Sequence, residues 1–442
     1  MSSPITTPPI SPACDAPHKR GMYRWTICAL LFLALTINYI DRLVFGILSP
    51  ELQKTFNWSN ADYTRIVFWF EVAYAIGLAG FGRVLDWVGT RRGFAISITG
   101  WSISAVLHAF MSTIAGFSLM RFLLGLSEAG VFPAAVKTAA EWFPRKERAL
   151  VAGIINAGSN VGAVVAPLLV PWLFLTYGWR WAFIITGGIG FAWIAFWLLL
   201  YRPPASHPRL SAEELAYIQS DPPEPVRRKI PWLTLLGLRQ TWAFILAKFL
   251  TDAVWRWYLY LLPLFFNQNF KLDIKNFGLP FVIIYVMADA GSIGGGWLSS
   301  WLLGRGWSVN AARKTAMLAC ALCVLPVMFS AVVPNMWMAV VFVGLAASAH
   351  QGFSSNLFTT VSDMFPKEAV GSVVGIGGTA GALGAMLLLT ITARLFAGAG
   401  GQAGNTGVYT TLFVIAGFAY LVSLAAVHLL SPKLKPVAPE DV

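Results

Sequence analysis

Long apolar segments recur along the whole chain, and short polar stretches separate them. Each is apolar over about 18 residues or more, which is enough for a helix to cross the hydrocarbon core of a bilayer. Barrel strands would alternate apolar and polar residues, and these segments do not. The pattern predicts twelve spanning helices, at residues 24–48, 62–82, 93–113, 117–140, 149–173, 181–201, 241–266, 278–303, 315–333, 336–362, 369–396 and 408–430.

Composition agrees with a membrane setting. The chain has 442 residues, of which 57% are hydrophobic and 12% charged, and its mean hydropathy is +0.65. Soluble domains carry about 25% charged residues. We therefore predict an all-α integral membrane protein.

Basic residues concentrate on alternate loops, namely those between the predicted helices 2 and 3, 4 and 5, 6 and 7, and 8 and 9. The opposite loops carry only Lys54, Arg180, Lys271 and Lys275. By the positive-inside rule both termini are cytoplasmic, which requires an even number of spans. The formal net charge of +12 thus reflects membrane topology, and we expect no nucleic-acid partner.

An internal repeat divides the chain. The stretch WFPRKERALVAGIINAGSNVGA (142–163) aligns without gaps to MFPKEAVGSVVGIGGTAGALGA (364–385), and Gly162 matches Gly384. Small residues repeated in this way let helices pack closely. Two pseudo-symmetric six-helix halves are typical of carriers with a site near the midplane.

These features set the expected domain boundaries. A cytoplasmic tail (1–23) precedes the first bundle (24–201), a cytoplasmic linker (202–240) follows, and the second bundle (241–430) leads to a tail (431–442). In the linker, Ser211 and Glu214 have the spacing of a capping box, which predicts one short surface helix. We otherwise expect a plain connector.

Charged residues inside the predicted spans are the strongest functional signal. Asp41 and Arg42 lie in the run FLALTINYIDRLVFGIL, and Arg121 and Glu128, two helical turns apart, share a helix face. A charge at the bilayer centre costs about 2.5–3.5 kcal/mol on insertion scales, so such residues usually line a functional cavity. Arginine binds a carboxylate through two hydrogen bonds, which nominates Arg42 and Arg121 as substrate anchors. Asp41 and Glu128 then become candidates for proton coupling, although structural salt bridges are the alternative.

Further polar residues in the spans suit a polyhydroxylated ligand, because aromatic and amide groups offer flat contacts and directional hydrogen bonds. Helix packing is the alternative for each. On the predicted seventh helix, Lys248, Asp252 and Arg256 are spaced by four and form one polar stripe. Lys248 can reach a ligand or pair with Asp252. His350 is expected to be a neutral, hydrogen-bonded residue, with proton transfer as the alternative. No role is assigned to Glu71 or Asp289. The nominated ligand contacts are Tyr74, Asn160, Lys248, Tyr258, Gln351 and Asn356.

The loop after the second predicted helix reads GRVLDWVGTRR. Its glycines allow a tight turn, and Asp86 can pair with Arg91 or Arg92 to hold one gating state. This spacing resembles the signature loop of the major facilitator superfamily. The matching loop in the second half has Ser300 where the acid would stand, so the resemblance implies a weaker latch there.

Four further stretches sharpen the resemblance: NYIDR (38–42), RFLLGLSEAGVFPA (121–134), KFLTDAVW (248–255) and the segment 349–378. Together they resemble the anion:cation symporter branch of that superfamily, and bacterial hexuronate transporters in particular. The resemblance implies proton-coupled uptake of glucuronate or galacturonate, with Asp41 and Glu128 as protonation sites and Arg42 on the substrate carboxylate. Alternatives are a galactonate or glucarate symporter, an organic phosphate:phosphate antiporter, or a sensor that binds a sugar acid without moving it.

The chain has no phosphate-binding loop and no soluble catalytic domain, which argues against an enzyme or a nucleotide-driven pump. Cys320 and Cys323 form C-x-x-C inside a span without nearby partner ligands, so we interpret them as packing residues. We expect no cofactor and no metal. The expected protein is a monomer in a bacterial inner membrane, with a small sugar-acid anion, protons and lipid as its partners.

Overall fold

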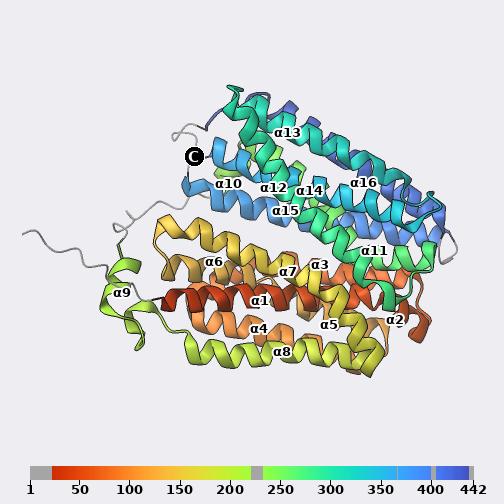
Figure 1. Ribbon diagram of the computed structural model, residues 1–442, viewed down its shortest axis with the longest axis horizontal. Helices are drawn as coiled ribbons and strands as arrows, with labels where there is room; N and C mark the ends of the chain where they lie inside the picture. The colour runs from red at the N-terminus through yellow and green to blue at the C-terminus, as the bar shows by residue number, and fades with distance from the viewer. Residues whose placement is uncertain (1–21, 221–231, 366, 400–404, 438–442) are drawn as a thin grey trace, which may run out of the picture.

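The computed structural model describes residues 22–220, 232–365, 367–399 and 405–437. These ranges consist of helices joined by turns and loops, and they contain no strand (Figure 1). Within them, ten helical segments are long and apolar enough to cross a membrane. Two more helices of 29 and 32 residues, α3 and α11, have the length to do so and carry charged residues. The predicted all-α membrane architecture is confirmed.

The spanning helices form two groups that Figure 1 shows stacked on one another. The first group comprises α1 (Tyr23–Ile47), α3 (Asn60–Val88), α4 (Thr90–Leu107), α5 (Ile114–Glu128), α6 (Val131–Trp142), α7 (Arg145–Tyr177) and α8 (Trp179–Leu200). The second comprises α11 (Arg239–Phe270), α12 (Gly278–Gly304), α13 (Val309–Val324), α14 (Met336–Met364), α15 (Lys367–Gly398) and α16 (Thr406–Leu430). Short helices connect them: α2 (Ser49–Phe56), α9 (Ala212–Ile218) and α10 (Trp232–Leu236).

One predicted span is broken in the structure. The segment expected as a single helix at 117–140 is two, α5 and α6, and the break falls at Ala129 and Gly130. Pro133 explains it, because a proline lacks the amide hydrogen and its ring clashes with the carbonyl four residues earlier. That carbonyl belongs to Ala129. Ala129 and Gly130 nevertheless keep helical backbone angles, so α5 and α6 together form one candidate span, Ile114–Trp142.

The sequence repeat corresponds to a repeated helix contact. Gly162 on α7 faces the backbone of α1, where an added Cβ would lie 2.5 Å from the Thr36 carbonyl oxygen. Its counterpart Gly384 on α15 faces α11 in the same way, and a Cβ there would overlap the Phe249 carbonyl oxygen. Close helix approach at these glycines sets how α1 and α11 are held within their halves.

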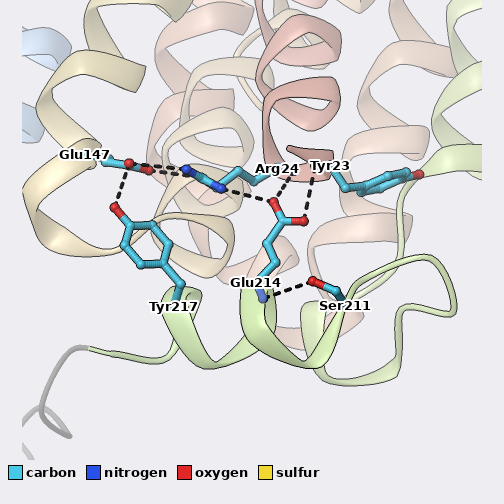
Figure 2. A network of polar contacts seen from close by, with 6 residues as sticks. All are labelled: Tyr23, Arg24, Glu147, Ser211, Glu214 and Tyr217. Carbon is cyan, nitrogen blue, oxygen red and sulfur yellow. Dashed lines mark hydrogen bonds and ion pairs between the residues drawn. The ribbon is translucent and has the colours of Figure 1, made fainter. Parts of the chain in front are cut away.

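The connector between the halves is attached to the first half (Figure 2). Ser211 accepts the amide hydrogen of Glu214 at 3.2 Å, as a helix cap should. The Glu214 carboxylate then leaves its own helix and accepts hydrogen bonds from the amides of Tyr23 and Arg24, at 3.2 and 3.1 Å. The expected helix exists as α9, and its docking on the first half, where Glu214 is only 2% exposed, was not predicted.

Arg24 extends this network. Its side chain pairs with Glu214 at 3.2 Å and with Glu147 on α7 at 3.1 Å, and Tyr217 of α9 donates a hydrogen bond to Glu147 at 2.7 Å. These contacts join α1, α7 and α9 at the end of the molecule where the described chain begins (Figure 2).

The two halves meet through hydrogen bonds between α3 and α11 at the opposite end. Asn60 and Gln268, at the ends of these helices, are 3.0 Å apart, and Tyr63 donates to the carbonyl of Tyr260 at 2.7 Å. The described chain starts and finishes at the other end, where α9 and α10 also lie (Figure 1). The bundle is therefore sealed between its halves at the end away from the termini.

Candidate functional site

A polar cavity of about 420 Å³ lies between the two halves. Its volume falls within the range of about 300–1,000 Å³ typical of small-molecule sites. The first half supplies Tyr39, Arg42, Tyr74, Asn156, Ser159 and Asn160. The second half supplies Lys248, Asp252, Trp255, Arg256, Leu259, Tyr260, Asp289, Ser292, His350, Gln351, Ser354, Ser355 and Phe358.

Arg42 is the main cation on the α1 side of this cavity. Its Nε and Nη2 atoms both contact Oε2 of Glu128, at 2.9 and 2.8 Å. The other oxygen of Glu128 is buried and has no hydrogen-bond partner. The guanidinium carbon of Arg42 lies 4.8 Å from the ring centre of Tyr74 and 5.2 Å from that of Tyr39. Glu128 thus pairs with Arg42 rather than with Arg121, with which it shares a face of the predicted helix.

Asp41 points away from the cavity, into the first half. It is 3% exposed, and neither carboxylate oxygen completes a hydrogen bond. Trp101 on α4 and Thr186 on α8 are the polar side chains beside it. Successive residues on a helix point about 100° apart, so Asp41 and its neighbour Arg42 face different surroundings.

Arg121 also lies outside the cavity wall, and it is 1% exposed. Its guanidinium carbon is 4.9 Å from the ring centre of Phe45 and 4.7 Å from that of Phe70. Its Nε and Nη2 atoms are buried without hydrogen-bond partners. Aromatic faces stabilise a cation by cation–π attraction, so in this structure Arg121 is held by rings.

On α11 the polar stripe predicted from the sequence faces the cavity. Lys248 pairs with Asp252 at 2.7 Å, and its ammonium nitrogen lies 4.5 Å from the ring centre of Phe358. His350 on α14 stacks on Trp255 with ring centres 4.8 Å apart. Its Nδ1 atom lies 2.8 Å from the hydroxyl of Tyr420. The histidine is thus anchored in the bundle while it lines the cavity.

The nominated ligand contacts divide into two groups. Arg42, Tyr74, Asn160, Lys248 and Gln351 line the cavity. Arg121, Tyr258 and Asn356 do not: Tyr258 packs beside Trp257, and Asn356 donates to the carbonyls of Gly295 and Gly352 at 2.8 and 2.9 Å. Helix packing, the alternative considered for these amide and aromatic residues, describes the last two.

The nominated gating residues lie at the end of α3 and the start of α4. Arg91 donates a hydrogen bond to the carbonyl of Leu198 on α8, and Arg92 is exposed. Asp86 lies outside the residues whose side chains are described. Its pairing with either arginine therefore stays a prediction.

The ligand contacts nominated from the sequence leave out several wall residues, of which Asp252, Arg256 and Asp289 carry charge. A signal for them was present. Lys248, Asp252 and Arg256 recur every four residues, and Asp289 is followed three residues later by Ser292. Polar residues at such helical spacing within an apolar span indicate a face turned to a cavity. Glu71, which received no role, pairs with Arg256.

The cavity holds its cations beside fixed acids. Arg42 pairs with Glu128, Lys248 with Asp252, and Arg256 with Glu71. An entering anion therefore competes with a resident carboxylate for each cation it contacts. Polar rings, amides and hydroxyls on both halves surround these pairs, so the cavity suits a small, hydrogen-bonding anion.

Comparison with known proteins places this geometry in context. The family model described as Major Facilitator Superfamily matches residues 31–389. The chain is 30% identical over 378 residues to the hexuronate transporter of Escherichia coli (strain K12), covering 84% of this chain and 87% of that protein. It is 31% identical to the galacturonate transporter of Dickeya chrysanthemi, covering 62% and 81%, and 28% identical to the D-galactonate transporter of Escherichia coli O6:H1, covering 86% and 91%.

The fold has solved counterparts. A bacterial homolog of the human lysosomal transporter Spinster, in an inward-facing and unoccupied conformation, superposes with a TM-score of 0.77, covering 94% of this chain and 99% of that one. At 18% identity this likeness concerns the fold alone. This likeness and the family match together assign the twelve spanning helices to two halves of six helices each. The chain belongs to the Major Facilitator Superfamily of membrane transporters.

Proposed function

We propose that the protein takes up a monocarboxylate sugar acid, a hexuronate such as glucuronate or galacturonate, together with protons and by alternating access. The names of its relatives, which are transporters of hexuronate, galacturonate and galactonate, support the substrate class. The observation that carries the proposal is the pairing of Arg42 with Glu128 at the cavity wall.

This pair links anion binding to protonation by simple electrostatics. When Glu128 takes up a proton its charge disappears, and Arg42 becomes available to the substrate carboxylate. When the substrate binds Arg42 first, a charged Glu128 loses its partner in a buried place, which is costly and favours its protonation. The unpartnered Oε1 of Glu128 offers a position for that proton.

Asp41 is proposed as a second proton site. Its carboxylate is buried and completes no hydrogen bond, and an unpaired charge in such a place is expensive unless the group holds a proton. It does not itself line the cavity, so it would act on α1 rather than on the substrate. The gating role of Asp86, Arg91 and Arg92 is retained as part of the proposal.

Sugar contacts in the proposal come from the remaining wall residues. Tyr74 and Asn160 on the first half, and Lys248 and Gln351 on the second, surround the space next to Arg42. Both halves thus contribute to a single site, as rocking about a midplane site requires. Arg121, Tyr258 and Asn356 would contribute only indirectly.

The test is uptake by purified protein in proteoliposomes. An acid-outside gradient is expected to drive accumulation of labelled glucuronate or galacturonate, with alkalinisation of the outer medium reported by a pH-sensitive dye. The electrical part of the gradient contributes about 2.3 kcal/mol per charge per 100 mV. Uptake of galactonate or glucarate in preference to hexuronates would identify one of these sugar acids as the substrate instead. Counterflow of phosphate without proton dependence would replace symport by antiport, and binding without any uptake would make the protein a sensor.

A further inference from the structure

Arg256 on α11 and Glu71 on α3 form an ion pair that joins the two halves of the protein. Glu71 is 0% exposed. Its Oε2 atom accepts from Nη1 of Arg256, and its Oε1 atom accepts from the hydroxyl of Tyr260 at 2.6 Å. Both oxygens of this buried carboxylate are therefore satisfied by the second half.

The two members of the pair differ in their access to the cavity. Arg256 lines it, and its side chain is 14% exposed, whereas Glu71 is enclosed behind the wall. An anion in the cavity can thus approach Arg256 from one side while Glu71 holds it from the other. Arginine has five donors, so it can contact two carboxylates, but each additional acid weakens its hold on the first.

Arg256 also lies close to the proposed anchor Arg42. Their guanidinium carbons are 5.2 and 4.8 Å from the centre of the same ring, that of Tyr74. The two cations come from opposite halves, and each has a buried glutamate of the first half as its partner. Tyr74 at the cavity wall therefore has a cation from each half beside its ring.

We propose that Arg256 is a second anion-binding residue of the cavity and that Glu71 is the resident carboxylate with which the substrate's acid group competes. The inference rests on the proposed function in taking a sugar-acid anion as the ligand. It assigns Glu71 a definite effect: its charge lowers the affinity for the substrate while it holds the halves together.

The location of the pair gives the competition a mechanical consequence. Glu71 lies 11 residues into α3, roughly 16 Å along the helix axis from the sealed end at Asn60. Among the described residues, it therefore makes the innermost of the hydrogen-bonded contacts between α3 and α11. An anion that draws Arg256 away from Glu71 removes this contact, so occupancy favours separation of the halves on that side.

Binding of glucuronate and galacturonate to purified protein, measured by calorimetry, tests the competition. Glu71→Gln keeps the shape and removes the charge, and we expect its dissociation constant to fall by about tenfold, which is about 1.4 kcal/mol. Arg256→Gln is expected to bind at least about tenfold more weakly. In the double variant, Glu71→Gln should produce no further gain, because the cation for which it competes is absent.

Control variants separate competition from loss of structure. Tyr260→Phe removes one hydrogen bond to Glu71 but keeps the charge, so it should change affinity less than Glu71→Gln. Asp273→Asn removes an exposed ion pair at the same end, in which Asp273 and Lys275 are 3.5 Å apart, and should bind like the wild type. Arg256→Lys keeps the charge without the planar fork and is expected to bind more weakly than the wild type but more tightly than Arg256→Gln.

The outcomes are distinguishable. A wild-type protein that binds sugar acids, combined with unchanged or weaker binding in Glu71→Gln, would overturn this inference and leave the proposed function intact. So would an equal gain from Glu71→Gln in the presence and absence of Arg256. A wild-type protein that binds no sugar acid would overturn both. If Glu71→Gln does not fold, weak binding by Arg256→Lys and Arg256→Gln still supports the subsite, and wild-type affinity in both refutes it.

Discussion

Arg42 and Glu128 are joined through a single carboxylate oxygen, although 86 residues separate them in the chain. The guanidinium faces the cavity and the carboxylate is enclosed behind it, so the pair connects the cavity to a buried acid. Two aromatic rings limit the movement of Arg42, which keeps its fork in a defined position. This arrangement supports the proposed exchange between cargo and proton.

Replacement of Arg42 by alanine is expected to abolish measurable sugar-acid binding. A hydrogen bond to a charged group contributes about 1.5–3 kcal/mol, and the variant also leaves Glu128 without its partner. Calorimetric titration of purified protein measures the loss. Arg313→Ala is the control, because Arg313 pairs with Asp363 at 3.1 Å outside the cavity. Binding by Arg42→Ala at the affinity of Arg313→Ala would contradict the anchor role.

Glu128→Gln is expected to spare exchange more than gradient-driven uptake. The amide has no charge to neutralise, so the carrier still binds and exchanges substrate but no longer draws a proton with it. Exchange of labelled for unlabelled substrate across proteoliposomes is compared with accumulation under an acid-outside gradient. Glu141→Gln is the matched control, since Glu141 contacts Thr90 and Tyr201 away from the cavity. Equal losses of both activities in Glu128→Gln would argue against proton coupling at this residue.

Gly384→Ala is expected to destabilise the protein, because its Cβ would overlap the Phe249 carbonyl where α15 crosses α11. Overpacking of this kind typically costs about 1–3 kcal/mol. Thermal unfolding in detergent is the measurement. Gly375→Ala, in the same repeat and with nothing within 4 Å of the added atom, should unfold at or above the wild-type temperature. A Gly384→Ala protein as stable as Gly375→Ala would show that the crossing adjusts freely.

Glu214→Gln is expected to loosen α9 from the first half. The substitution removes the charge that pairs with Arg24 and weakens the acceptor for two amides of α1. Breaking one side of a buried pair costs about 3–5 kcal/mol. Hydrogen exchange of the α9 amides should accelerate in this variant and not in Glu213→Gln, which changes the exposed neighbour on the same helix. Equal exchange in the two variants would mean that the pair is dispensable for docking.

Much of the fold could be predicted because the lipid environment leaves the backbone few possible conformations. A backbone in hydrocarbon must form its own hydrogen bonds, so a long apolar run has to be a helix. The break between α5 and α6 was missed because hydropathy averages over residues and does not register one proline. The docking of α9 was missed because the spacing of Ser211 and Glu214 predicts a local cap. The carboxylate instead caps α1, which is nearly 200 residues away in the chain.

The site was predicted in part for a related reason. Helical spacing showed that Lys248, Asp252 and Arg256 share a face, and the structure turns that face to the cavity. Spacing also placed Arg121 and Glu128 on one helix face. In the structure, however, Glu128 forms an ion pair with Arg42, and Arg121 lies against the rings of Phe45 and Phe70. Periodicity within one helix does not reveal which neighbouring helix a face meets.

By itself, the sequence determined the membrane-spanning helices, the duplication and the presence of costly charges within the spans, since each of these follows from local hydropathy and residue identity. Only the tertiary structure decided which charges meet. Glu128 joins Arg42 across 86 positions, and Glu71 joins Arg256 across 185. Ion pairs act over a few ångströms, and helix packing alone brings such distant segments that close.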